Sequence, residues 1–299
     1  MVIPTRNRPS QLRHCLDALS KLDYTREDFE VLIVDDGGRS PLEPLVAGFS
    51  SRLQLQLCRQ PHAGPGAARN TGAAAARGQW LVFIDDDCAP RVDYLRQIDL
   101  HLEHYPHAMV GGRTVNGVAT NPFSTASQML VDVLYEYFRR ESRLRFFTSN
   151  NLVVPIKEYR RLGGFAANWA YAAAEDRDFC DRWQHDGGQL SEAGHAIIEH
   201  HHVLGAASFL RQHFNYGRGA FHFHEARKRD GRGRHQLESF RLYGLLLRTP
   251  YQKMPLFRAT MVSILLLLSQ LANVVGFFYE KAREGMASLG WARPWQVCQ

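Results

Sequence analysis

Three consecutive carboxylates, Asp85, Asp86 and Asp87, follow directly on the apolar run Trp80–Ile84. Five apolar residues in a row predict a buried strand, and ligands of open α/β sheets bind just beyond the carboxyl ends of the strands. Adjacent carboxylates repel one another, so a fold that collects them usually neutralises them with a cation. Hard oxygen donors suit Mg²⁺ or Mn²⁺, which often bridge to a substrate phosphate. The alternative is an acidic turn that caps the next helix.

The segments before this run alternate between strand and helix patterns. Strands are expected at residues 2–4, 30–34 and 53–57, and an alanine-rich helix at residues 67–76. Strands separated by short helices imply parallel pairing through right-handed crossovers. The second strand also runs into two acids, Asp35 and Asp36. Two strands therefore deliver carboxylates to the same edge of one sheet.

A nucleotide site must satisfy a base, a ribose and a charged diphosphate. Asp35 or Asp36 can accept from a base N–H or a ribose hydroxyl, and the Asp85–Asp87 run can hold the ribose and a metal. The turn Gly64-Pro65-Gly66 lets backbone come close to a ligand. Arg69, in the helix that follows, can pair with phosphate, although a surface salt bridge is an equally good account of it.

These segments resemble the motifs of the family 2 glycosyltransferases with the GT-A fold, and they occur in the family's order. The matching segments are Val2-Ile3-Pro4-Thr5-Arg6-Asn7-Arg8, Val34-Asp35-Asp36-Gly37, Gly66-Ala67-Ala68-Arg69-Asn70-Thr71-Gly72 and Phe83-Ile84-Asp85-Asp86-Asp87. The likeness runs from residue 2 to about residue 220. It implies an α/β fold, with a Rossmann-like, mixed and mainly parallel sheet flanked by helices.

The resemblance also implies a donor and a cofactor. The donor is a nucleotide-diphosphate sugar, with a UDP-sugar favoured, and the cofactor is a divalent metal, Mn²⁺ or Mg²⁺. Thr5 and Asp36 are expected to contact the base, Asp86 the ribose and Asp87 the metal. The rest of the predicted donor site is Pro4, Arg8, Asp35, Arg69 and Asp85, of which Asp85 is also a candidate metal ligand.

The second half of the matched region is expected to bind the acceptor. Asn150 and Asn151 lie within the strand-like run of residues 146–154. A buried pair of amides needs partners, and a sugar hydroxyl would supply them, although backbone capping is equally plausible. Gly164 and Trp169 complete the predicted acceptor site.

Glu175 and Asp176 stand where a helix is expected to begin. Acids in a first helical turn are favoured by the helix dipole, which is the structural explanation. The functional explanation is that an acceptor hydroxyl must lose its proton as it attacks the anomeric carbon, and a positioned carboxylate contributes about 10²–10⁴-fold to such a step. The resemblance favours Asp176 as the base and Glu175 as an acceptor contact.

Three histidines, residues 200–202, follow an apolar strand-like segment. In related enzymes a histidine at a strand end is the usual third protein ligand of the metal. Side chains alternate along a strand, so His200 or His202 is favoured, and the sequence does not choose between them. Arg218 lies in a segment similar to the family's Tyr-Gly-Arg run and is expected to neutralise the departing diphosphate, with helix packing as the alternative.

The tail of the chain has a different composition. Residues 259–279 carry no charge, and a helix of that length spans about 31 Å, close to a bilayer core. Trp291 and Trp295 can sit at headgroup level. Ser263, Gln270 and Asn273 cluster on one side, so an interfacial or packed helix is the alternative.

These patterns predict a domain plan and a location. Residues 1–220 form the catalytic domain, with a nucleotide-sugar half (1–115) and an acceptor half (116–220), and residues 221–299 form a helical, membrane-associated extension. Five scattered cysteines without disulfide or metal spacing suit a reducing compartment. We therefore expect attachment at the cytoplasmic face of the membrane and a glycan or lipid-linked acceptor. The formal charge of +6 is modest, and the chain has no nucleic-acid-binding motif.

The function predicted from these features is a metal-dependent inverting glycosyltransferase of cell-envelope or other glycan synthesis. A nucleotidyltransferase also uses paired acids and metal, but it normally needs a glycine-rich, basic loop after the first strand, which residues 5–10 lack. A non-catalytic sugar-nucleotide or glycan-binding protein is the third possibility. The acids at 87 and 176 and the histidines count against it.

Overall fold

The computed structural model describes residues 1–140, 145–167, 173–233 and 240–288. Within them, one sheet has the strand order β3-β2-β1-β4-β7-β6-β8-β5. The strands are β1 (Val2–Thr5), β2 (Val31–Asp36), β3 (Leu55–Gln60), β4 (Trp80–Ile84), β5 (Cys88–Pro90), β6 (Met109–Asn116), β7 (Asn151–Pro155) and β8 (Leu190–His200).

The sheet is mixed and mainly parallel. Strands β3, β2, β1 and β4 run parallel, β7 is antiparallel to both β4 and β6, and β5 is antiparallel to β8. Strands β1 and β2 are buried along their whole length, as expected for parallel strands covered on both faces. The predicted fold class is confirmed.

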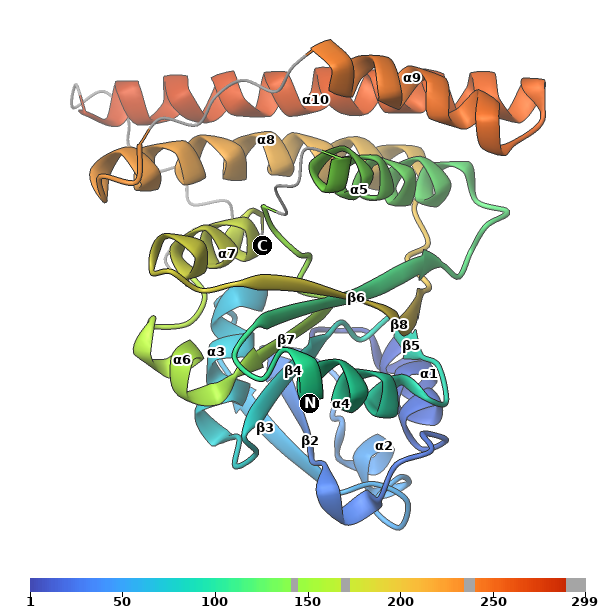
Figure 1. The fold of residues 1–299 in the computed structure, drawn as a ribbon, viewed down its shortest axis with the longest axis vertical. Coiled ribbons are helices and arrows are strands. Elements are labelled where there is room, and N and C mark those ends of the chain that lie inside the picture. The colour runs from blue at the N-terminus through green and yellow to red at the C-terminus, as the bar shows by residue number, and fades with distance from the viewer. Residues whose placement is uncertain (141–144, 168–172, 234–239, 289–299) are drawn as a thin grey trace.

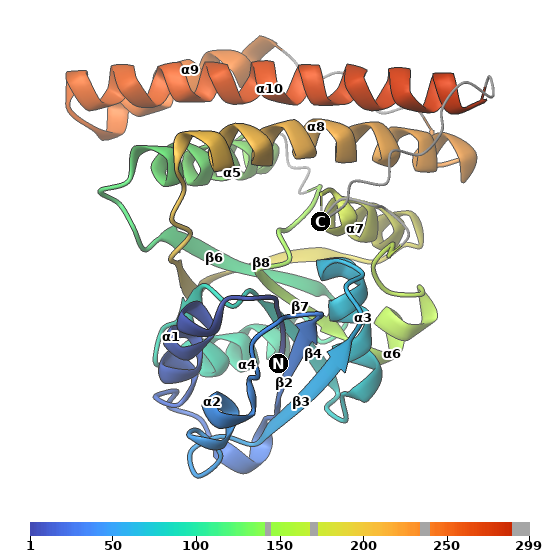
Figure 2. The same ribbon diagram turned by 180° about the vertical axis from the view of Figure 1, so that it is seen from behind.

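Helices cover the sheet on both faces and add a further layer at one end (Figures 1 and 2). They are α1 (Pro9–Leu19), α2 (Glu43–Ala47), α3 (Pro65–Ala75), α4 (Tyr94–His104), α5 (Pro122–Arg140), α6 (Ile156–Arg161), α7 (Glu175–His185), α8 (Ala206–Arg229), α9 (Phe240–Lys253) and α10 (Leu256–Ser288), with a 3₁₀ turn at Arg26–Asp28. One apolar core lies between the sheet, α1 and α4, and the other joins the sheet to α3, α5 and α7.

Some local predictions are shifted in the structure. The third strand begins at Leu55 rather than residue 53, because Leu53 packs into the core from a turn. The strand expected at 146–154 begins only at Asn151, since Phe147 packs into the core and the Asn151 N–H closes a turn on the Thr148 carbonyl. The expected domain boundary at residue 220 falls inside α8.

Helices α8 and α10 run side by side in the end layer (Figures 1 and 2). Their backbones touch at two glycines: a Cβ on Gly217 would overlap the Asn273 carbonyl oxygen, and a Cβ on Gly276 would overlap that of Phe214. Between the same helices Arg218 Nε donates to Glu280 Oε2 at 2.6 Å, and both side chains are buried. The C-terminal helix is therefore fixed along its length to the rest of the fold.

Substitution of Gly276 tests this close crossing. Alanine is a better helix former than glycine by about 1 kcal/mol, so Gly285→Ala, at an open position of the same helix, should raise or preserve stability. Gly276→Ala should instead lower the free energy of unfolding by about 1–3 kcal/mol, because the added methyl overpacks the crossing. Denaturant melts of both variants and the wild type measure the difference; equal behaviour of the two alanines would contradict the packing.

Candidate active site

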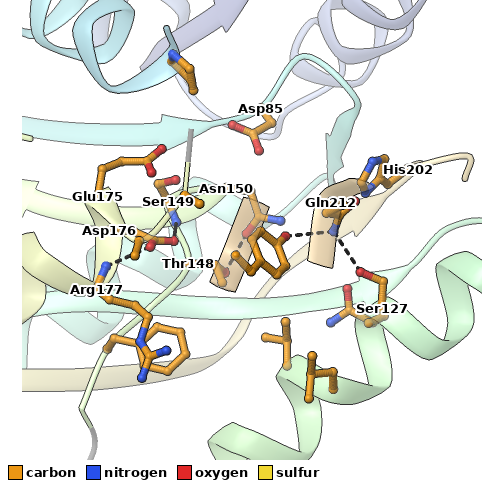
Figure 3. Close-up of a pocket in the computed structure, with 18 of the residues that line it drawn as sticks. Asp85, Ser127, Thr148, Ser149, Asn150, Glu175, Asp176, Arg177, His202 and Gln212 are labelled. Atoms are coloured by element: carbon orange, nitrogen blue, oxygen red, sulfur yellow. Dashed lines mark hydrogen bonds between the residues drawn. The ribbon is translucent and has the colours of Figure 1, made fainter. Parts of the chain in front are cut away.

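A cavity of about 800 Å³ lies between the sheet and the end layer of helices (Figure 3). It collects most of the residues singled out by their chemistry: Pro4, Thr5, Arg8, Asp36, Arg69, Asp85, Asp86, Asp87, Asn150, Glu175, Asp176, His200 and His202. They come from segments far apart in the sequence and meet because β1, β2 and β4 end at the same edge of the sheet.

The acids after β4 are held by residues that follow β1. Thr5 Oγ1 donates to Asp86 Oδ2 at 2.7 Å, and Arg8 lies 2.8 Å from Asp86 Oδ1 and 2.5 Å from Asp87 Oδ2. Burial raises the pKa of Asp86 to about 7, against the opposing pull of Arg8 and Thr5. The Thr5 hydroxyl donates its hydrogen to Asp86 in this arrangement, and its oxygen can still accept a hydrogen bond.

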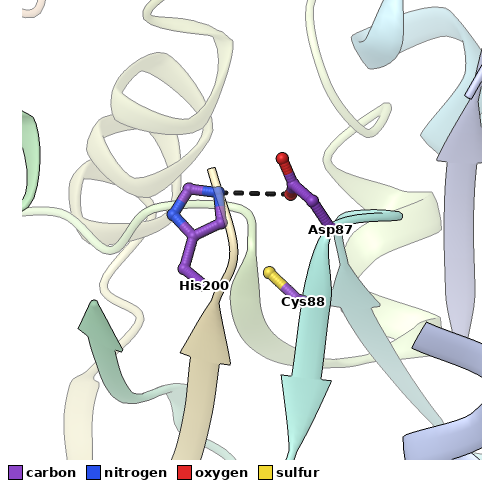
Figure 4. A group of neighbouring side chains, drawn as sticks. All are labelled: Asp87, Cys88 and His200. Atoms are coloured by element: carbon purple, nitrogen blue, oxygen red, sulfur yellow. Dashed lines mark ion pairs between the residues drawn. The ribbon is translucent and has the colours of Figure 1, made fainter. Parts of the chain in front are cut away.

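Asp87 also faces His200, which lies at the end of β8 (Figure 4). The antiparallel pairing of β5 with β8 sets Cys88 opposite His200 and brings His200 Nε2 to 3.2 Å from Asp87 Oδ1. Burial favours the neutral forms of both groups. The attraction between the charged forms is stronger than this effect of burial, so the pKa of Asp87 is lowered and the pKa of His200 is raised.

The other two histidines of the run separate as strand alternation predicts. The His202 ring stacks on that of His200 with 5.0 Å between centroids, and burial lowers the pKa of His202 to about 4. The His201 ring instead contacts that of His14, and His201 does not line the cavity. Both favoured histidines therefore face the cavity.

The donor set around Asp87 fits a divalent cation. Oxygen, sulfur and nitrogen atoms of Asp87, Cys88 and His200 lie within 4.8 Å of one another. Asp87 Oδ1 is buried, and beside His200 Nε2 at 3.2 Å it accepts no further hydrogen bond from the described residues. Carboxylate oxygens suit Mg²⁺ or Mn²⁺, whereas imidazole and thiol are softer donors. Cys88 was missed by spacing rules because only the β5–β8 pairing brings it here.

The acid pair lies at the start of α7, across the cavity from β4. Ala174, directly before it, has a φ of +69°, a conformation that costs a non-glycine residue free energy and is typical of functional sites. Glu175 Oε1 accepts from Arg69 Nη1 at 3.2 Å, and Arg69 also pairs with Asp85 at 2.7 Å. Sequence gives no sign of the strained turn.

Asp176 has other partners than Glu175 (Figure 3). Its two oxygens accept from the backbone N–H groups of Arg177 at 2.7 Å and Ser149 at 3.3 Å. Burial raises the pKa of both Glu175 and Asp176, and repulsion between the two carboxyls adds to the rise in Glu175. The pair is thus poised to hold a proton more firmly than ordinary carboxylates do.

Asp36 lines the cavity, but its oxygens already hold a loop. It accepts from Gln60 Nε2 and from the backbone N–H groups of Ala63 and Gly64, at 2.7 to 2.9 Å. These bonds lower its pKa although burial opposes them. Asp35 does not line the cavity and accepts from the Gly38 N–H at 2.8 Å.

Three other predicted site residues within the described part of the chain are not brought to this cavity. Asn151 accepts from the Tyr94 hydroxyl at 2.9 Å, and Gly164 lies beside α3, where an added Cβ would meet Asn70. Arg218 forms the buried pair with Glu280 described above, because its helix face meets α10. Trp169, like Trp291 and Trp295, lies outside the described residues.

The metal assignment is tested by neighbouring histidines that point in opposite directions. His200→Ala should weaken Mn²⁺ binding by about tenfold or more, since it removes the nitrogen beside Asp87. His201→Ala should leave the affinity unchanged, because that ring does not line the cavity. Titration calorimetry with Mn²⁺ in the presence of UDP measures both; equal loss, or loss only in the His201 variant, would contradict the assignment.

Comparisons with known proteins agree with this geometry. A family model described as glycosyl transferase family 2 matches residues 1–172, more than half of the chain. The pre-mycofactocin glycosyltransferase of Mycobacterium tuberculosis is 28% identical over 228 residues, which are 74% of this chain and 46% of that protein. The chain therefore spans less than half of that relative's length. Glycosyltransferase AglE of Haloferax volcanii is 23% identical over 229 residues, covering 73% of this chain and 71% of that protein.

Solved structures share the fold. The mannosyltransferase PcManGT of Pyrobaculum calidifontis, in complex with GDP-Man and Mn²⁺, superposes with a TM-score of 0.59 at 17% identity, covering 99% of this chain and 81% of that one. TarS of S. aureus in complex with UDP-GlcNAc gives 0.56 at 15% identity, covering 100% and 93%. With the motifs at the sheet edge and the family match over residues 1–172, the chain belongs to glycosyl transferase family 2.

Proposed function

We propose that this chain is a metal-dependent inverting glycosyltransferase that moves a sugar from a nucleotide-diphosphate sugar, with a UDP-sugar favoured, to an acceptor hydroxyl. One observation carries the proposal. The carboxylates that suit a metal-bound donor line one side of the cavity, and the acid pair that suits proton abstraction lines the other. We propose that the transfer serves cell-envelope or other glycan synthesis and takes place in a reducing compartment.

The donor end would be built from the acids after β4 and the groups that pair with them. Asp87 and His200 would hold the divalent ion, with Asp85 near it, and the bound ion would supply positive charge to the diphosphate. Thr5 and Arg8 orient Asp86 toward the ribose. Arg69, only 4% exposed, lies between Asp85 and Glu175. Arg69 and Arg8, rather than Arg218, would neutralise the departing diphosphate.

Asp176 would act as the base. It takes the proton of the acceptor hydroxyl while the acceptor oxygen forms its bond to the anomeric carbon and the bond to the diphosphate oxygen breaks. A single displacement inverts the anomeric centre. Glu175 is engaged by Arg69 at 3.2 Å, whereas Asp176 accepts only backbone N–H groups among the described residues. Asp176 is therefore the better placed of the two to accept a proton.

Substitution of the acid pair tests these roles. Asp176→Asn should leave donor affinity near normal and reduce turnover by about 10²-fold or more, because the amide cannot take the proton. Glu175→Gln should chiefly weaken donor binding, since it loosens Arg69. Steady-state kinetics with calorimetric donor binding separate the two effects. A larger loss of turnover in Glu175→Gln would indicate that Glu175, not Asp176, is the base. Retention of the anomeric configuration in product NMR would contradict a role for Asp176 as the base.

Attachment to a membrane surface is the second part of the proposal. Leu256–Met286 is the one described helix that is long and apolar enough to cross a bilayer. It lies along α8, which carries charged residues, and the Arg218–Glu280 pair joins the two helices. Its outward side remains apolar and exposed, at Ile264, Leu267, Leu268, Leu271 and Val275. We therefore favour a helix that lies on the cytoplasmic face rather than one that crosses it.

A charge on the outward side of α10 tests this attachment. Leu268→Glu should reduce co-sedimentation with phosphatidylglycerol vesicles several-fold, because it places a carboxylate among the apolar groups that enter the interface. Val203→Glu, at an exposed apolar position in the segment between β8 and α8, serves as the matched control and should bind as the wild type does. A wild-type chain that stays soluble, monodisperse and unbound to vesicles would contradict the attachment.

A further inference from the structure

The cavity that holds the acids has a second, apolar end. Beyond the acid pair its walls come from the end layer of helices: Leu130, Val131 and Leu134 of α5, Leu242 and Leu246 of α9, and Phe277 of α10. Figure 3 shows α5 below the labelled polar residues of the same cavity. We call this end the apolar chamber. Leu130, Leu242 and Leu246 are buried, whereas Val131, Leu134 and Phe277 are only partly buried. An apolar occupant that covers the latter three would stabilise the chamber.

Gln212 of α8 and Gln128 of α5, which line this half of the cavity together with Gln270 and Asn273 of α10, are engaged within the protein. Gln212 donates to Ser127 Oγ at 3.0 Å and to the Tyr216 hydroxyl at 2.8 Å. Gln128 donates to the Thr114 carbonyl at 3.2 Å and to Asp132 at 2.9 Å. A second sugar ring would need such groups for its hydroxyls, and these amides already have partners. The chamber thus suits hydrocarbon better than carbohydrate.

The acid pair and its neighbour mark the junction between the two ends. Asp176 faces the cavity, and the next residue, Arg177, stacks its guanidinium on Phe146 and Phe223 at 5.0 and 5.6 Å from the ring centroids. An acceptor oxygen at Asp176 therefore has polar surroundings on the donor side and aromatic and aliphatic surroundings on the other. A molecule placed across this junction has to be polar at one end and apolar at the other.

The chamber also reaches the exposed apolar side of the helix layer. Tyr243, Val274 and Phe278 line the cavity and are at the same time 46%, 51% and 59% exposed. A chain that leaves the chamber between α9 and α10 would emerge beside the surface proposed to lie on a membrane.

We propose that the acceptor is an amphiphile, whose reacting hydroxyl lies at Asp176 and whose hydrocarbon chain fills the apolar chamber. The proposal rests on the proposed glycosyl transfer and specifies its acceptor class. It accounts for one cavity having two chemically different ends and for the opening of the apolar end beside the apolar surface.

Two adjacent valines provide a matched pair for its test. Val274 and Val275 are both 51% exposed on α10, but only Val274 lines the cavity. The probe is octyl β-D-glucoside with a diazirine at the end of its chain, photolysed on the full chain, with labelled positions mapped by mass spectrometry. We expect labels on chamber residues of α5, α9 and α10. Val274→Trp should reduce them at least fivefold by filling the chamber, and Val275→Trp should not.

Competition adds a measurement on the unaltered chain. Unlabelled octyl glucoside should compete at least about 100-fold better than methyl glucoside, since each buried methylene contributes about threefold or more. Equal competition, labels confined to the outward residues around Leu268, or equal labelling of the two tryptophan variants would overturn the proposal. Mn²⁺-dependent UDP binding is measured on the same samples: its loss would contradict the proposed function, whereas normal UDP binding with unlabelled chamber residues contradicts only the amphiphile.

Discussion

The structure depends on keeping several carboxylates close together in a partly dry cavity. Asp86 and Asp87 are each 2% exposed, and buried carboxylates are costly unless paired. Arg8 from the β1–α1 loop, Arg69 from α3 and His200 from β8 supply the opposing charge from three separate parts of the fold. The sheet order and the β5–β8 pairing are what bring those three groups to one edge. Removal of any one would take a charged partner from at least one of these carboxylates.

The end layer of helices turns this charged sheet edge into an enclosed site. Helix α8 can approach the acid pair closely because a Cβ on Gly219 would overlap the Ala173 carbonyl oxygen, directly before the strained Ala174. The same helix holds α10 through Gly217 and Arg218. One helix therefore supports the turn that carries Asp176 on one side and the apolar surface on the other. This arrangement links the position of Asp176, the proposed base, to the docking of the C-terminal helix.

Much of the catalytic half could be predicted from sequence, because its information is local. An apolar run followed by acids identifies β4 and the site beyond it, and alternation correctly separated His201 from its two neighbours. Contacts between residues far apart in the chain could not be predicted from such local patterns. The pairing that adds Cys88, the buried partner that takes Arg218 away from the cavity and the left-handed Ala174 all depend on tertiary packing. The apolar chamber likewise arises only where α5, α9 and α10 meet, so no single helical stripe revealed it.

The central claim is that the acid cluster and the acid pair work on a nucleotide-sugar donor with the help of a divalent ion. Release of nucleoside diphosphate from a panel of UDP-, GDP- and dTDP-sugars, with Mn²⁺ and after its removal by chelation, tests it most directly. The account predicts release from one donor class that depends on Mn²⁺ and is restored when the ion is returned. Release that is insensitive to chelation, or no release from any donor in the presence of Mn²⁺ and membrane lipid extract, would contradict it.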